Sequence, residues 1–135
     1  MFHICVAGAG AWGTTMANLV AARAHVILWA HGEDTIRMLR DTRENSIYLP
    51  GIRLHDDIEP TCDLLQAWNA ADAVILAIPT QKLRSVLAPL IINRGKRLPV
   101  LSLSKGLECD THMRISQIVC DDLNLVDREY FAAVS

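Results

Sequence analysis

The sequence has no pair of cysteines at a metal-binding spacing, and this absence narrows the classes of protein that it can belong to. Its four cysteines are spread over 135 residues, at Cys5, Cys62, Cys109 and Cys120. Structural zinc sites usually draw on CxxC-like pairs, and small secreted domains on a dense set of cysteines. We therefore expect reduced thiols, with Cys5 in a buried strand, and neither a metal site nor a disulfide framework.

An excess of charge of one sign is also missing. The chain has 13 Lys and Arg against 15 Asp and Glu, for a net charge of −2 at pH 7, and its basic residues are scattered. Proteins that bind nucleic acid or anionic membranes usually gather Lys and Arg on one face. The sequence therefore predicts neither nucleic acid nor a membrane as a partner.

The one long stretch without charge, from Ile4 to Ala22, is interrupted by glycines, threonines and Asn18. It ends near an Ala-Arg-Ala sequence that resembles a signal-peptidase site, so a secretory signal is the alternative interpretation. Nothing basic precedes the stretch, as a signal peptide requires. We expect a cytoplasmic protein. Because no repeat, linker or low-complexity segment appears, residues 1–135 are predicted to form one domain.

Short apolar runs alternate with segments of helical composition along the chain. The predicted strands are His3–Gly8, His25–Ala30, Ala73–Ile78, Pro99–Ser104 and Tyr130–Ser135. The predicted helices are Thr14–Arg23, Glu33–Arg43, Asp63–Ala70, Gln81–Asn93 (kinked or broken at Pro89) and Thr111–Asp122, with a loop over Asn45–Asp57. Such alternation implies parallel strands joined by right-handed crossovers. The fold class is α/β, a doubly wound parallel sheet of the Rossmann type.

A GxGxxG motif, Gly8-Ala9-Gly10-Ala11-Trp12-Gly13, joins the first strand to the first helix. Gly8 permits the tight turn, Gly10 lets a pyrophosphate approach the backbone, and Gly13 brings the helix close to the strand. The amides of Ala11, Trp12 and Gly13 would face the phosphates at the helix N-terminus. A glycine-rich turn that binds nothing is the alternative. For the Trp12 indole, packing against the next loop and contact with the cofactor are equally favoured.

The end of the second strand bears on the choice between NAD and NADP. NAD-binding folds place an acid there for the ribose 2′-hydroxyl, but this sequence has Ala30 and His31. A histidine can donate to a 2′-phosphate, so we expect the site to tolerate NADP and to prefer it over NAD. Glu33 and Asp34 lie just beyond, and we interpret them as carboxylates that stabilise a helix N-terminus.

Other unusual residues follow further strands of the predicted sheet. Pro79-Thr80 and Lys105-Gly106 come directly after apolar runs, and the Asn45–Gly51 segment follows the second helix. Ligands of open α/β sheets bind at the carboxyl ends of the strands. We therefore expect the Lys105 ammonium to face the ligand crevice, the alternative being a solvated surface lysine.

Several motifs occur together, in order and at matching spacing. They are Gly8–Thr14, Leu28-Trp29, Asn45 with Tyr48–Gly51, Pro79-Thr80 and Lys105–Glu108. In these the chain resembles the bacterial NAD(P)-dependent glycerol-3-phosphate dehydrogenases, which reduce dihydroxyacetone phosphate to sn-glycerol 3-phosphate for glycerophospholipid synthesis. The resemblance implies that the glycine loop (Gly8, Gly10, Ala11, Trp12, Gly13), His31, Tyr48, Pro79 and Lys105 bind the cofactor, and that Lys105 also binds the phosphate substrate.

The chain departs from the family in composition and in length. The family often has Ser, Arg and Gly where this chain has Ala11, His31 and Ala24. Its members are much longer, and a helical second domain supplies the proton-donating lysine and much of a dimer interface. We therefore expect no catalytic proton donor within residues 1–135. A nucleotide-binding module without activity and a reductase of a different small substrate are the alternative functions.

Overall fold

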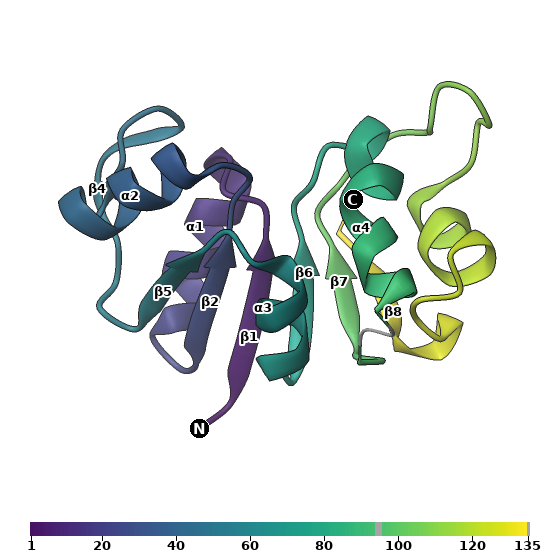
Figure 1. Cartoon of the computed structure of the whole chain (residues 1–135), viewed down its shortest axis with the longest axis horizontal. Helices are drawn as coiled ribbons and strands as arrows, with labels where there is room; N and C mark the ends of the chain where they lie inside the picture. The colour runs from purple at the N-terminus through teal and green to yellow at the C-terminus, as the bar shows by residue number, and fades with distance from the viewer. Residues whose placement is uncertain (94–95, 135) are drawn as a thin grey trace.

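The computed structural model describes residues 1–93 and 96–134, which form a six-stranded parallel sheet. The strands follow the order β5-β2-β1-β6-β7-β8 (Figure 1). Their bounds are β1 His3–Ala7, β2 His25–Trp29, β5 Ile58–Thr61, β6 Ala73–Leu76, β7 Val100–Ser102 and β8 Phe131–Ala133. This architecture confirms the predicted α/β fold class.

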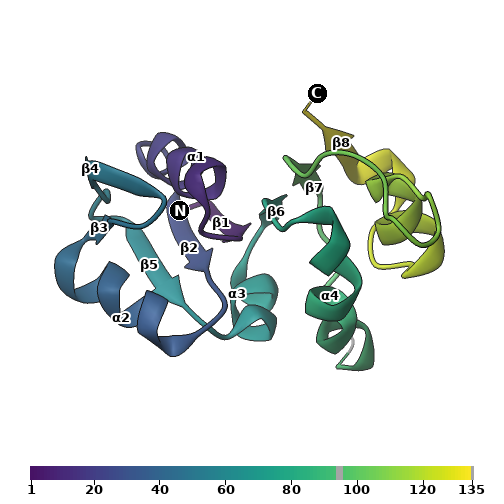
Figure 2. The same ribbon diagram turned by 90° about the horizontal axis from the view of Figure 1, so that it is seen from above.

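Helices cover both faces of the sheet. The helix bounds are α1 Ala11–Ala21, α2 Glu33–Thr42, α3 Leu64–Ala70 and α4 Leu83–Ile92. α1 and α2 bury their apolar residues against one face, and α3, α4 and the segment 115–126 against the other. Figure 2 shows α1 and α4 on opposite sides of the sheet. Because helices cover both faces of the central strands, successive β1 residues pack into different hydrophobic clusters, Cys5 on one face and Val6 on the other.

The predicted loop over Asn45–Asp57 is wrong, because β3 (Glu44–Asn45) and β4 (Leu49–Arg53) form an antiparallel hairpin there. Pro50 and Gly51 lie inside β4. Four of the five β4 residues are exposed. The strand therefore lacks the alternation of apolar and polar residues by which a half-buried strand is recognised in a sequence.

β5 is a strand that the sequence analysis missed. It lies at the edge of the sheet and contains Pro60, which edge strands tolerate. Two arginines at the end of α2 donate to its carbonyls, Arg40 to Pro60 at 3.0 Å and Arg43 to Ile58 at 3.0 Å. These bonds fix α2 against the edge of the sheet.

The helices predicted over Thr14–Arg23 and Gln81–Asn93 have different bounds in the structure. α1 begins at Ala11, before the predicted Thr14, because the glycine loop itself forms its first turn. α4 continues through Pro89 without a break, since the buried Leu87 and Leu90 hold both halves on the sheet. Residues 80–82 form the separate 3-10 turn η1 (Thr80–Lys82).

The predicted helix Thr111–Asp122 starts too early. Leu107 pairs with Arg114 in a β-bridge, which keeps residues 107–114 out of a helix. Helical structure runs from residue 115 and continues as the π-helix η2 (Gln117–Asp122). The 3-10 turn η3 (Arg128–Tyr130) precedes β8. The last residue of the predicted strand Tyr130–Ser135 lies outside the described residues.

The cysteines differ in their access to solvent, which predicts their reactivity. Burial raises the pKa of the Cys5 thiol to about 12, and it also raises the pKa of Cys120. Cys62 and Cys109 are exposed. Because the thiolate is the reactive form, we expect Ellman's reagent to label Cys62 and Cys109 rapidly in the native protein and Cys5 and Cys120 only after denaturation. Rapid native labelling of Cys5, located by peptide mapping, would contradict the packing described above.

Candidate functional site

The carboxyl ends of the central strands open into a cavity of about 350 Å³. It is lined by Gly10, Ala11, Trp12, Gly13, Ala77, Ile78, Pro79, Leu103, Ser104 and Lys105. The structure thus brings together the glycine loop, Pro79 and Lys105, three separate regions that the sequence analysis assigned to one site. A second open hollow, of about 410 Å³, lies beside η2 and η3 and contains none of the predicted site residues. Among the described residues, no group of three His, Cys, Asp or Glu side chains could hold a metal ion.

Glycine occupies the three positions of the loop for different reasons. Gly8 has φ +123°, and a Cβ on it would lie 2.3 Å from the carbonyl oxygen of Ala77. A Cβ on Gly13 would lie 1.9 Å from the carbonyl oxygen of Gly8. Apart from its chain neighbours, a Cβ on Gly10 would meet no heavy atom of residues 1–93 and 96–134 within 4 Å, and its φ of −74° suits any residue. The fold therefore requires Gly8 and Gly13, whereas Gly10 keeps the space in front of the loop open.

The first turn of α1 presents backbone donors to this space. Thr14 makes the first helical hydrogen bond, to Gly10, and no side chain caps the helix. Within the described part of the chain, no carbonyl or side chain accepts from the amides of Ala11, Trp12 and Gly13. No carboxylate lies in this turn. Free amides and the positive end of the helix dipole together favour an anion here.

The buried Asn45 connects the β3–β4 hairpin to the glycine loop. Its side-chain amide donates to the carbonyl of Ala9 at 2.7 Å and to Thr14 Oγ1 at 2.9 Å, and its Oδ1 accepts from the amide of Tyr48 at 3.3 Å. The sequence places Asn45 in a motif of the family resemblance but does not predict this role. An Asn followed by Ser, a few residues before a Pro-Gly sequence, looks like an ordinary turn residue, so no local signal marks it as buried.

The two aromatic side chains near the loop are open to solvent. Trp12 is 65% exposed and Tyr48 is 57% exposed. The Trp12 indole is therefore not packed into a core, and it remains free to contact a ligand of the cavity.

At the end of β2, His31 is exposed and its ring lies edge-on to Trp29, with centroids 6.4 Å apart. Gly32, with φ +96°, starts α2, and Glu33 and Asp34 lie exposed in its first turn. This placement is the one expected for carboxylates that stabilise a helix N-terminus.

The segment that carries Lys105 leaves β7 at the other side of the cavity. The backbone carbonyl of Lys105 accepts from Thr80 Oγ1 at 2.5 Å, and Gly106 turns the chain with φ +85°. The Lys105 side chain is exposed at the cavity. A cation on a fixed backbone next to free amides can hold one anionic ligand together with them.

Comparison with known sequences extends these observations. A family described as the NAD-dependent glycerol-3-phosphate dehydrogenase N-terminus matches residues 3–130. Proteins named glycerol-3-phosphate dehydrogenase [NAD(P)+] are 44% identical in Syntrophomonas wolfei and 40% identical in Geobacillus kaustophilus. The alignments cover 100% and 91% of this chain and 40% and 36% of the relatives. The chain thus spans about two fifths of the length of these relatives.

Solved structures give the same result. A glycerol-3-phosphate dehydrogenase of Plasmodium falciparum matches with a TM-score of 0.80 and 27% identity, over 92% of this chain and 38% of that one. The enzyme of the same name from Coxiella burnetii matches in fold, with a TM-score of 0.82 and 22% identity over 93% of this chain and 38% of that one. The family match over residues 3–130 confirms the resemblance seen in the sequence, and the chain belongs to the family of NAD-dependent glycerol-3-phosphate dehydrogenase N-terminal domains.

Proposed function

We propose that this chain binds NAD(P)H along the carboxyl edge of its sheet, with the pyrophosphate at the N-terminus of α1. Gly10 is the observation that carries the proposal. Its neighbours in the motif, Gly8 and Gly13, are needed for backbone packing, whereas a Cβ on Gly10 would meet no heavy atom of the described residues within 4 Å beyond its chain neighbours. A glycine that the fold does not need lies beside three free amides, where a phosphate would approach.

The surrounding residues fit a dinucleotide. Ala11 offers its amide, and the exposed rings of Trp12 and Tyr48 offer flat apolar surfaces. Pro79 starts η1 and closes one wall of the cavity. Lys105 brings a cation to the same cavity. Gly8, Gly10, Ala11, Trp12, Gly13, His31, Tyr48, Pro79 and Lys105 are the proposed cofactor site.

For the reaction, we propose the reduction of dihydroxyacetone phosphate to sn-glycerol 3-phosphate, for glycerophospholipid synthesis. When bound, the nicotinamide supplies the hydride. The Lys105 ammonium holds the substrate phosphate or the carbonyl oxygen as negative charge grows on it. The proton donor is a lysine of a helical second domain, as the family resemblance implies. A cytoplasmic location and a homodimer of the full-length enzyme stay predictions; none of the helices among the described residues is long and apolar enough to span a membrane.

The exposed His31 predicts that NADPH binds more tightly than NADH. Titration with either cofactor, followed by tryptophan fluorescence, measures both dissociation constants, and Trp12→Phe shows whether the signal comes from Trp12. His31→Asp should weaken NADPH binding about tenfold, because a carboxylate repels the 2′-phosphate. The exposed His55, replaced in His55→Asp, serves as the control and should change neither constant. A tenfold preference of the unmodified protein for NADH would overturn the assignment.

Turnover is the second test of the proposed function. We expect the 135-residue chain to bind NADPH but to oxidise it with dihydroxyacetone phosphate at close to the uncatalysed rate, because the proton donor lies outside it. Rapid substrate-dependent oxidation would show that the donor lies within these residues. Binding without turnover in the full-length protein would favour a nucleotide-binding module, and turnover with another ketone would favour a related reductase.

A further inference from the structure

A carboxylate with little access to solvent lies three residues after Lys105. Glu108 is 7% exposed, and Arg84 Nε of α4 donates to its two oxygens at 2.9 and 2.7 Å. Thr111 Oγ1 donates to one of these oxygens at 2.5 Å. Both carboxylate oxygens therefore accept hydrogen bonds from side chains of the protein, which hold the Glu108 side chain in place.

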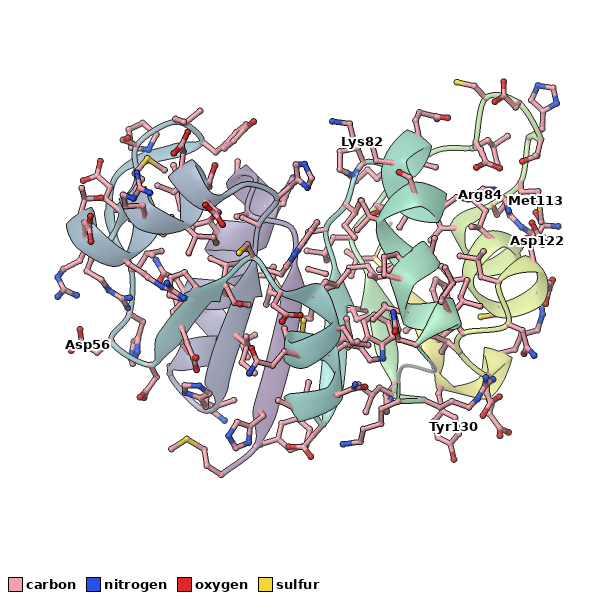
Figure 3. All side chains as sticks on the ribbon, in the orientation of Figure 1. Asp56, Lys82, Arg84, Met113, Asp122 and Tyr130 are labelled. Carbon is pink, nitrogen blue, oxygen red and sulfur yellow. The ribbon has the colours of Figure 1, made fainter. Side chains whose placement is uncertain are left out.

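The Arg84 guanidinium joins three segments of the chain. It binds Glu108, it is ion-paired with Asp122 of η2, and its Nη2 lies 3.2 Å from Met113 Sδ. Figure 3 shows Arg84, Met113 and Asp122 side by side, where α4 faces the segment after β7. Hydrogen bonds from Arg84 and Thr111 hold the pKa of Glu108 below its usual value, so the ion pair is charged at neutral pH.

Two further residues before Arg84 hold the same segment. Thr80 binds the carbonyl of Lys105, and the Gln81 side chain donates to the carbonyl of Leu107 at 2.9 Å and accepts from the amide of Cys109 at 2.8 Å. The segment 105–109, which we name the lysine loop, has no strand or helix of its own beyond the bridge at Leu107. Contacts with η1 and with the start of α4 therefore determine its course.

A contribution to stability is by itself a weak explanation for a partly buried ion pair such as Arg84–Glu108. Desolvation of two charges offsets much of their attraction, and apolar residues of similar size often stabilise a protein as well or better. The contacts of Arg84 and Glu108 act on the loop whose backbone carries Lys105. Their shared effect is to fix the backbone position from which the Lys105 side chain extends at the cavity.

We propose that Arg84 and Glu108 are positioning residues, which fix the lysine loop so that the Lys105 ammonium lies where it contacts the bound dinucleotide. This inference rests on the proposed function, in which Lys105 binds the cofactor. It adds that the affinity contributed by Lys105 depends on an ion pair that touches neither cofactor nor substrate.

A double-mutant cycle on the 135-residue chain tests the inference. Lys105→Gln and Glu108→Gln are measured alone and together by NADPH titration, with thermal melts to verify folding. We expect each single variant to weaken NADPH binding about tenfold and the double variant about tenfold as well, because Glu108 acts through Lys105. A purely structural role would give effects that multiply, to about a hundredfold in the double variant.

Asp127→Asn is the matched control, because it removes the exposed ion pair with Arg97, away from the lysine loop. It should leave NADPH affinity unchanged. If Glu108→Gln does not fold, Gln81→Ala loosens the same loop from the exposed turn η1 and replaces Glu108→Gln in the cycle. A folded Glu108→Gln or Gln81→Ala protein with unchanged affinity, or effects that multiply, overturns the inference alone. A Lys105→Gln protein with unchanged affinity removes Lys105 from the proposed cofactor site and overturns the inference with it, whereas the pyrophosphate site at α1 stands as long as NADPH binds. Absence of NADPH binding by the unmodified protein overturns the proposed function and the inference with it.

Discussion

Gly13→Ala is expected to destabilise the protein by about 3 kcal/mol, the upper part of the usual range for overpacking a tightly packed site. Helix propensity alone favours alanine over glycine by about 1 kcal/mol in α1. The new Cβ would, however, lie 1.9 Å from the carbonyl oxygen of Gly8, a backbone atom that cannot rotate away. The collision outweighs the propensity, and α1 must move off β1. Urea denaturation, monitored by circular dichroism, measures the decrease in the free energy of unfolding.

Gly10→Ala is the matched substitution in the same motif, and the opposite result is expected. Its Cβ enters open space at a φ that alanine adopts freely, so the free energy of unfolding should stay the same or rise slightly. The methyl group would occupy the approach to the α1 amides, and NADPH affinity should fall about a hundredfold. Equal stability of Gly13→Ala and the unmodified protein, or NADPH binding by Gly10→Ala at full affinity, would contradict the roles assigned to these glycines.

Asn45→Ala is expected to lower both the stability of the protein and its affinity for NADPH. The change removes three hydrogen bonds and leaves the hydroxyl of Thr14, which is 0% exposed, without its side-chain donor. Each buried polar group without a partner costs about 1–3 kcal/mol, so we expect a total loss of about 3 kcal/mol. NADPH affinity should also fall, because Asn45 holds Ala9 of the glycine loop. Urea denaturation and fluorescence titration measure the two effects.

Asn18→Ala provides the control for this prediction. Asn18 also joins α1 to the hairpin region, with bonds to the carbonyl of Arg53 at 3.3 Å and from the amide of His55 at 2.9 Å, but it does not touch the glycine loop. We expect a smaller loss of stability and no change in NADPH affinity. If both variants lose affinity equally, the hairpin acts through its general attachment to α1, and the specific link through Asn45 is wrong.

The sequence predicted the parts of the fold that rest on burial. The central strands are covered on both faces, so their apolar runs appear directly in the sequence, as in Ala73–Leu76. β4 and β5 escaped notice because they lie at exposed edges, where Pro50 and Pro60 suggest a loop and packing imposes no pattern. The composition of residues 111–114 permits the predicted helix, whereas the Leu107–Arg114 bridge that excludes it is a tertiary feature.

The same distinction applies to the site. The glycine loop and Lys105 could be placed at one edge because parallel strands end on the same side of a sheet. Asn45, Thr80 and Arg84 could not be assigned roles, because each acts through a partner at least 24 residues away. A sequence displays which residue types are present, but distant pairings become visible only once the chain is folded.

The Arg40 and Arg43 contacts with β5 have a consequence for association between chains. An open sheet edge normally presents unpaired amides and carbonyls on which another strand can add, the first step of many aggregates. In β5 the outward carbonyls, those of Ile58 and Pro60, are taken by the two arginines. The amide of Ile58 binds His55, and proline has no amide to offer. Backbone pairing is thus saturated along this strand, and the sheet cannot be extended from it into an intermolecular one.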